Sequence, residues 1–199
     1  MTPQRALLLL ALVAPACAHA DWFVTTPLAR SNAQNELRAD WLAEKGNRTA
    51  QRYSFGLGNG FTVAASHSPA NAWGADFSYN YLPAFLDESP ALSVGVLDIA
   101  DETPEGRTLY AAFTFRFGNI EPHNQDTSTD LTIGIWSRNG SSAFVNVAYP
   151  ITNRWLLIAE GTREDVSAGF ELRPVSQVAV RLLTRESGPF LGASLRWQF

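Results

Sequence analysis

Apolar and polar residues alternate along most of this chain, and a period of two is the period of a β-strand. In the stretch 109–117, for example, Leu, Ala and three Phe residues occupy every second position. No window after residue 20 shows a convincing helical stripe, and the best helical candidate, residues 33–45, also alternates from Leu37 onward. The pattern predicts about twelve strands, over residues 35–45, 50–58, 61–68, 72–82, 91–100, 108–118, 129–138, 142–149, 153–161, 165–173, 176–184 and 189–199.

Turn signals separate these strands and join them as successive hairpins. Asn59-Gly60 and Asn139-Gly140 are residue pairs that tight hairpin turns favour. The longest expected loops are residues 83–90 and 119–128, and no linker or change of composition divides the chain. The sequence therefore predicts one all-β meander.

Alternation is common to soluble barrels and membrane barrels, which differ in the face that is apolar. Trp73 and Tyr81 lie on one face of one strand, eight residues apart. That separation spans about 27 Å along a strand and about 20 Å across a membrane after strand tilt, close to the ~25 Å apolar band of membrane barrels. The opposite face is rich in Arg, Gly, Ser and Thr, which suits a lumen. We expect an antiparallel up-and-down transmembrane β-barrel of about twelve strands, with ten or eight if short runs merge.

This interpretation assigns each face its residues. The candidates for the lumen wall are Arg38, Asp40, Arg52, Asp76, Arg116, Asp130, Arg138, Glu171, Arg173, Arg181 and Arg196. The candidates for lipid contact and for the aromatic girdles are Trp73, Tyr81, Phe113, Phe115, Phe117, Trp155, Trp197 and Phe199. Arg outnumbers the acids in the lumen set, so an open lumen is expected to prefer anions weakly.

The first twenty residues have the pattern of a secretory signal peptide. Arg5 precedes an uncharged apolar run over residues 6–14, and Ala18-His19-Ala20 is a small-residue cleavage site. We expect cleavage after Ala20, an N-terminal periplasmic segment over residues 21–34 and a barrel domain over residues 35–199. Cys17 is the single cysteine of the chain, so cleavage removes it; lipidation of Cys17 is the alternative.

The amino-acid composition excludes some classes of protein. The chain has 199 residues, of which 46% are hydrophobic and 17% charged, with a formal net charge of −4. Its apolar and aromatic content excludes a disordered protein. It has no basic excess, which argues against a nucleic-acid partner.

The end of the chain resembles the last strand of bacterial outer-membrane barrels. Leu191, Ala193, Leu195, Trp197 and Phe199 alternate with small or polar residues, and the chain ends in Phe. In that class the terminal strand with its final Phe is read by the barrel assembly machinery. The resemblance implies an outer-membrane location, with lipid and that machinery as partners.

The region from Tyr149 to Phe199 is similar to YjbH-like barrel proteins. A strand ending in Ala159-Glu160 precedes the motif Asp165-Val166-Ser167-Ala168-Gly169, and residues 25–30 look like the first segment of such proteins. The resemblance covers roughly a third of this chain, which is much shorter than full-length members. It implies a link to exopolysaccharide production and supplies no catalytic residues.

A search for chemistry finds no convincing site. His67 and His123 are the only histidines after residue 20, and the adjacent Ser66 and His67 point to opposite faces of a strand, so they form no catalytic pair. Residues 126–130 form a polar turn without the spacing of a calcium loop. The glycines at 56, 58 and 60 belong to a hairpin, because no helix follows them.

The sequence thus predicts a non-enzymatic outer-membrane barrel without metal or cofactor. It would serve as a structural or small-channel component of the envelope, with a possible polysaccharide partner for its Arg and Asp side chains. The alternatives are a soluble periplasmic barrel that binds an apolar ligand and, less favoured, an outer-membrane hydrolase.

Overall fold

The computed structural model describes residues 25–29, 32–44, 48–82, 90–118, 128–137 and 140–199. The strands are β1 (Glu36–Glu44), β2 (Arg48–Gly58), β3 (Phe61–His67), β4 (Trp73–Leu82), β5 (Ala91–Leu97), β6 (Thr108–Phe117), β7 (Thr129–Trp136), β8 (Ser142–Pro150), β9 (Trp155–Thr162), β10 (Val166–Val175), β11 (Val178–Arg185) and β12 (Gly188–Gln198). Among the described residues, no helix is long and apolar enough to cross a membrane.

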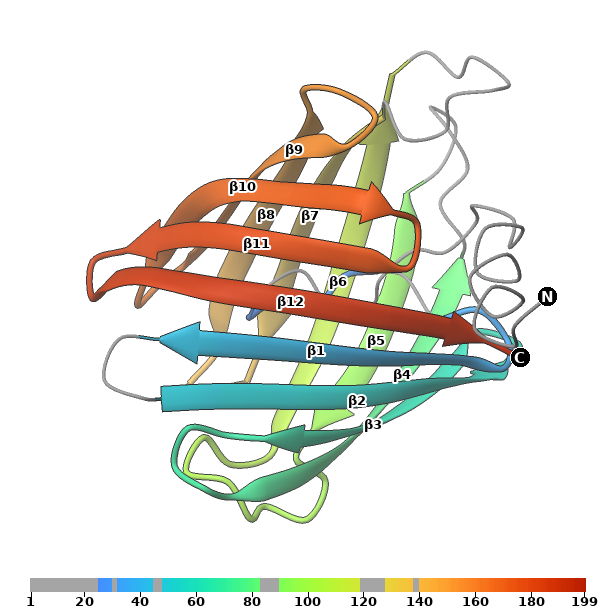
Figure 1. The fold of residues 1–199 in the computed structure, drawn as a ribbon. Coiled ribbons are helices and arrows are strands. Elements are labelled where there is room, and N and C mark those ends of the chain that lie inside the picture. Colours follow the sequence, from blue (N-terminus) through green and yellow to red (C-terminus); the bar gives the residue numbers. More distant parts are fainter. Residues whose placement is uncertain (1–24, 30–31, 45–47, 83–89, 119–127, 138–139) are drawn as a thin grey trace, which may run out of the picture.

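The strands form one closed antiparallel barrel in which each strand pairs with its neighbours in sequence (Figure 1). The first and last strands close it, with Leu37 opposite Trp197 and Ala39 opposite Leu195. The prediction of an all-β up-and-down barrel with twelve strands is therefore confirmed. Closure leaves no unpaired sheet edge, so the backbone groups of the wall are satisfied within the wall itself.

The two ends of the barrel differ. The chain enters β1 and leaves β12 at one end, which we call the terminal end (Figure 1). The β2–β3 hairpin also lies there, and Asn59 and Gly60 turn with φ angles of 52° and 82°, as a two-residue hairpin turn requires. At the opposite or distal end, residues 98–107 form the connection between β5 and β6.

The outer face of the wall is apolar. Phe113, Ile133 and Val145 lie side by side on β6, β7 and β8, because the register pairs Ile133 with both of the others. Their side chains are 40%, 45% and 42% exposed. Exposed large apolar side chains occur on every strand from β2 to β12, and Leu37 and Trp41 of β1 are half-buried, so the outer surface is an apolar belt.

Aromatic side chains border this belt at both ends. On β4, Trp73 lies at the distal end and Tyr81 at the terminal end, 50% and 63% exposed. Phe117, Trp155 and Trp197 are also exposed where their strands meet the terminal end. All the predicted outward residues are exposed except Phe115, which is half-buried.

Candidate functional site

The inner face of the wall carries ion pairs that extend across neighbouring strands. Glu171 on β10 and Arg181 on β11 lie directly opposite in register, and the carboxylate is 2.5 Å from Arg181 Nε. Arg181 also lies 3.6 Å from Asp40 on β1, which in turn accepts two hydrogen bonds from Arg38, at 3.0 and 2.6 Å. Glu171 accepts a further hydrogen bond of 2.5 Å from Arg173. These five side chains form one network through β10, β11 and β1.

Three further ion pairs lie on the inner face. Arg116 and Asp130 lie opposite each other on β6 and β7, with 3.0 Å between Nε and Oδ1. Arg52 on β2 binds Asp76 on β4 across the intervening strand. Arg196 lies 3.2 Å from Glu36, which is fully buried. Charges held in so confined a space are stable only when paired in this way.

The ten predicted lumen residues that fall within the described chain all enter such pairs. Arg138 lies outside the described residues. These ten side chains come from eight strands, which are β1, β2, β4, β6, β7, β10, β11 and β12. What the residues do in the lumen stays a prediction.

Glu160 is a lumen residue that the sequence analysis missed. It lies on β9 and is 4% exposed. The run Leu156-Leu157-Ile158 hid it, because apolar residues on both sides of the strand obscure the alternation. The sequence signal that could have found Glu160 is the period of two, because Leu156, Ile158 and Glu160 occupy every second position and therefore face the same side. Leu156 and Ile158 are buried on the inner face as well.

Most of the hydrogen-bond partners of Glu160 come from residues 25 and 26, which precede β1. Its carboxylate accepts hydrogen bonds from the backbone N–H of Thr25 (3.0 Å) and from the hydroxyls of Thr25 (2.7 Å) and Thr26 (3.2 Å). Ser167 on the next strand donates a further hydrogen bond of 3.2 Å. On the other side, the amide of Asn146 donates to the Thr26 hydroxyl at 2.9 Å.

These wall residues belong to one row of polar side chains that runs across five strands. The register places consecutive members directly opposite one another, from β10 to β6: Ser167, Glu160, Asn146, Thr132 and Thr114. All five are buried. We call them the polar row. Its far end binds the chain start too, since the Thr114 hydroxyl accepts a hydrogen bond of 3.1 Å from the backbone N–H of Ala29.

Residues 25–29, which we call the lumen segment, therefore lie inside the barrel. Thr26, Pro27, Leu28 and Ala29 are all buried. Successive residues of an extended chain point to opposite sides, so four buried in succession must have protein all around them. Leu28 packs in an apolar cluster with Ile158, Leu183 and Phe190, and Ala29 in a second cluster with Tyr110, Trp136 and Phe144.

The sequence analysis expected residues 21–34 to form a periplasmic segment. In the structure, Thr25, Ala29 and Asn32 of that stretch bind side chains of the inner wall. Beyond the lumen segment, Asn32 donates hydrogen bonds to Thr62 (3.3 Å, from its backbone) and to Ser54 (2.9 Å, from its side chain). The sequence shows no sign of these contacts, because a short stretch without periodicity does not reveal partners on distant strands, and the periplasmic location of residues 21–34 stays a prediction.

Gly56 permits the close approach of this stretch to β2. A Cβ atom on Gly56 would lie 2.0 Å from the backbone oxygen of Ala33, far inside van der Waals contact. The Gly56 carbonyl also accepts a hydrogen bond of 2.9 Å from the backbone N–H of Asn35. Gly56 is therefore a packing requirement for the chain start, in addition to its place before a hairpin.

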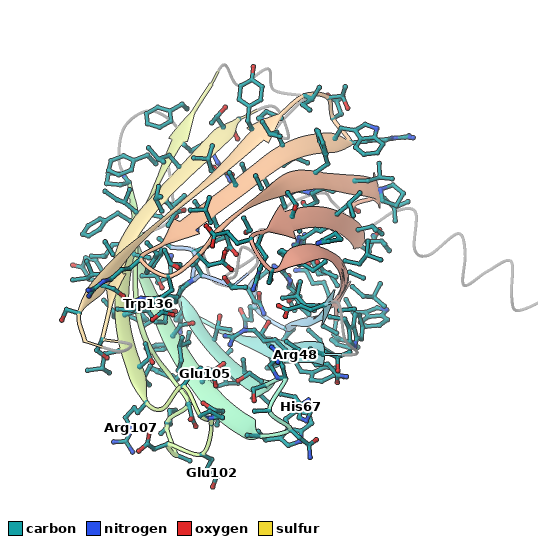
Figure 2. All side chains as sticks on the ribbon, turned by 90° about the vertical axis from the view of Figure 1, so that its left-hand side faces the viewer. Arg48, His67, Glu102, Glu105, Arg107 and Trp136 are labelled. Atoms are coloured by element: carbon teal, nitrogen blue, oxygen red, sulfur yellow. The ribbon has the colours of Figure 1, made fainter. Side chains whose placement is uncertain are left out.

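A cavity of about 210 Å³ lies at the distal end, on the far side of the lumen segment. Its walls include Asp40, Arg52, Asp76 and Arg181 of the ion pairs, and Thr25 of the lumen segment. Residues 98–107 border it, with Glu105 toward the opening and Glu102 and Arg107 below it (Figure 2). The cavity thus reaches from the distal rim to the residues that occupy the barrel interior.

Asp98 holds the connection between β5 and β6, residues 98–107, in place against the inner wall. Its carboxylate accepts hydrogen bonds from the backbone N–H of Glu102 (3.0 Å) and from both the backbone N–H (2.6 Å) and the hydroxyl (2.7 Å) of Thr103. Its own backbone N–H donates to Asp76 at 2.8 Å. Burial raises the pKa of the Asp98 carboxyl, but the hydrogen bonds from Thr103 and Glu102 outweigh burial and hold this pKa below its usual value.

Ser66 and His67 do not form a catalytic pair. Ser66 Oγ is 3.5 Å from the carbonyl of Gly74, whereas His67 Nε2 is 3.2 Å from Asn71, so the two are engaged elsewhere. Within the described ranges, no group of three or more His, Cys, Asp or Glu side chains could hold a metal ion. His123 lies outside the described residues.

Comparison with known proteins places the fold. No model of a known protein family matches this chain, and no curated protein matches it. Among solved structures, it resembles the KdgM porin in complex with disordered oligogalacturonate, with a TM-score of 0.57 and 12% identity over 82% of this chain and 99% of that one. It also resembles the KdgM porin alone, with a TM-score of 0.55 and the same identity and coverage. The outer membrane protein Omp33 of Acinetobacter baumannii gives 0.54 and 10% over 84% and 98%.

The chain has the fold of these porins. At such low identity the likeness concerns the fold alone. The resemblance of residues 149–199 to YjbH-like proteins has no matching family model and stays a prediction.

Proposed function

We propose that this protein is a non-enzymatic outer-membrane barrel of the porin type, with a narrow lumen suited to small polar solutes. The observation that carries the proposal is the sidedness of the closed barrel: the outer belt is apolar, and the ion pairs and buried hydroxyls lie on the inner face, beside two apolar clusters. A membrane barrel has this sidedness, because its outer band contacts lipid and its interior contacts water.

The soluble alternative fits this sidedness poorly. A soluble barrel that binds an apolar ligand would bury its apolar side chains inside and expose polar ones. Here Phe113, Ile133 and Val145 are outside, whereas Arg38 and Glu171 are buried inside. A hydrolase is disfavoured by the separate engagement of Ser66 and His67.

The solute class follows from the chemistry of the inner face. Guanidinium, carboxylate and hydroxyl groups give both donors and acceptors, which suit the hydroxyls of a saccharide. The KdgM structure, similar in fold, is described as a complex with oligogalacturonate. Because the inner-face Arg residues pair with carboxylates and Glu160 adds an acid, we now propose weak charge selectivity in place of the anion preference expected from the Arg excess.

The remaining partners are part of the same proposal. Membrane lipid would cover the apolar belt, the assembly machinery would recognise the strand ending in Phe199, and a signal peptide would be removed after Ala20. An association with exopolysaccharide export rests on the YjbH-like resemblance of residues 149–199.

Two measurements test the proposal. Cells expressing the protein should contain it in the detergent-extracted outer membrane, with the heat-modifiable gel mobility of a closed barrel. The purified protein in planar bilayers should give discrete current steps of small amplitude, with little preference between K⁺ and Cl⁻. Recovery in the soluble periplasmic fraction would overturn the membrane assignment, and complete electrical silence of the wild type and of every variant would leave a scaffold in place of a channel.

A further inference from the structure

The polar row forms a binding surface on the inner wall of the barrel, and the lumen segment occupies it. The polar row presents acceptors at Glu160 and Thr114 that are satisfied by backbone N–H groups of Thr25 and Ala29. Backbone N–H groups are common to every peptide, so the row is suited to an extended chain with regularly spaced donors.

We propose that the lumen segment is an internal plug, and that the polar row is the site at which this plug binds. Binding closes the path between the distal cavity and the terminal end, and release opens it. The proposal goes beyond the passage of solutes by naming what controls it.

The position of the segment supports a plug. Thr25 lines the distal cavity and at the same time bonds to Glu160, so the cavity meets the segment. Four residues from Thr26 to Ala29 are buried, and Ala29 bonds to β6 while Thr25 bonds to β9. The segment therefore runs along the inner wall from β9 to β6. Leu28 packs on residues of β9, β11 and β12, and Ala29 packs on residues of β6, β7 and β8, so the segment fills part of the interior between these strands.

The nature of the contacts supports release. Hydrogen bonds and the apolar side chains of Leu28 and Ala29 hold the segment to the wall, and none of these contacts is an ion pair. Glu160 is the centre of this contact, because three of the hydrogen bonds that its carboxylate accepts come from the segment. Hydrogen bonds to a charged acceptor are stronger than neutral ones, so the charge of Glu160 sets the strength of closure.

A disulfide across the contact tests the plug directly. Thr26 and Asn146 are in hydrogen-bond contact and belong to the segment and to β8 respectively. The full-length double variant Thr26→Cys, Asn146→Cys, with Cys17→Ser, should form this disulfide on oxidation, detected by mass spectrometry of peptides. The oxidised protein should be electrically silent in planar bilayers, and reduction should restore openings.

A matched disulfide within the wall is the control. Ser93 on β5 and Ala112 on β6 lie directly opposite in register and are both buried on the inner face. The variant Ser93→Cys, Ala112→Cys links two strands that already pair and should leave the current unchanged on oxidation and reduction.

A second variant weakens the plug without fixing it. Glu160→Gln removes the charge that the segment binds, and the fraction of time spent open should rise by about tenfold, the factor that the loss of one charge-assisted hydrogen bond predicts. The control Glu44→Gln makes the same chemical change on β1, where the carboxylate binds Arg185 at 3.1 Å. It should leave the open fraction near that of the wild type.

The outcomes separate the plug from the channel function. Failure of the Thr26–Asn146 disulfide to form in a barrel that is folded by gel mobility would overturn the position of the plug. Equal current in the oxidised and reduced double variant would overturn closure while supporting a channel. Silence of the reduced variant and of Glu160→Gln, with the disulfide formed, would overturn release and the channel proposal together and leave a permanently filled scaffold.

Discussion

The Glu171 carboxylate and the Arg181 guanidinium lie directly opposite each other on β10 and β11, 2.5 Å apart, and both side chains are buried. Arg173 binds the same carboxylate, so Glu171 pairs with two cations inside the barrel. A buried charge that loses its partner is costly, which makes this pair a sensitive point of the inner wall.

Removal of this acid should destabilise the barrel strongly. Glu171→Gln leaves Arg181 with the more distant Asp40, and we expect the free energy of unfolding to fall by about 3 kcal/mol. Urea unfolding in lipid vesicles measures it. Glu102→Gln, the same change at an exposed position of the distal connection, should stay within about 0.5 kcal/mol. An equal effect of the two changes would contradict the importance of the buried pair.

The outward facing of β7 gives a second prediction. Ile133→Arg places a charge on the apolar belt, and we expect a loss of about 2–4 kcal/mol if the position lies near the bilayer midplane. Ile151→Arg makes the same substitution in the β8–β9 turn, where the side chain is also exposed, and should cost much less. Urea titration of both variants in vesicles compares them. Similar losses for Ile133 and Ile151 would argue against lipid contact at β7.

The alternation of side chains was enough to place the wall. The predicted strand 108–118 is observed as Thr108–Phe117, and the Asn59-Gly60 pair turns where it was expected. The same period assigned Arg116 and Asp130 to one face of the sheet. The connection between their two strands then sets the register, which places the two residues opposite each other. These features depend on residues that are near one another in the sequence, so a local sequence pattern is enough to predict them.

The contents of the lumen were not predictable in this way. The hydrogen bond between Ala29 and Thr114 joins residues 85 apart, and that between Thr25 and Glu160 joins residues 135 apart. Such contacts arise only when the barrel has closed and five strands have brought the polar row into register. Gly56 was interpreted as a hairpin glycine for the same reason, since the approach of Ala33 is a tertiary contact.

The close approach at Gly56 predicts a sensitive glycine. Gly56→Ala would place a methyl group 2.0 Å from the Ala33 carbonyl oxygen, so residues 32–35 must move away from β2. We expect a loss of about 1–3 kcal/mol in the free energy of unfolding, as for other overpacked sites. Gly161→Ala is the control, because its nearest neighbour would be Val145 at 3.5 Å. If both alanine variants are equally stable, the chain start does not pack against Gly56.

The distal connection should respond to acid through Asp98. Its lowered pKa means that the folded protein stabilises the charged carboxylate form of Asp98 relative to the unfolded chain. The resulting stabilisation is complete above the unfolded pKa of about 4 and is lost as the pH falls through the lower folded pKa. Hydrogen exchange of residues 98–107, corrected for its intrinsic pH dependence, should therefore accelerate below about pH 4. Asp98→Asn should abolish this response, and its persistence in that variant would assign it to another group.

The last residue should matter for assembly more than for stability. Phe199 is 80% exposed, so its ring buries little area in the folded barrel, and Phe199→Ala should change the free energy of unfolding of refolded protein by less than about 0.5 kcal/mol. In cells the same variant should reach the outer membrane in severalfold lower yield, because the resemblance to other outer-membrane barrels implies that the final Phe is read during assembly. Phe117→Ala, at an exposed aromatic of the same end of the barrel, should keep the wild-type yield. Outer-membrane fractionation and quantitative blotting measure both. A normal yield for Phe199→Ala, or an equal loss for Phe117→Ala, would show that the terminal ring has no special role in assembly.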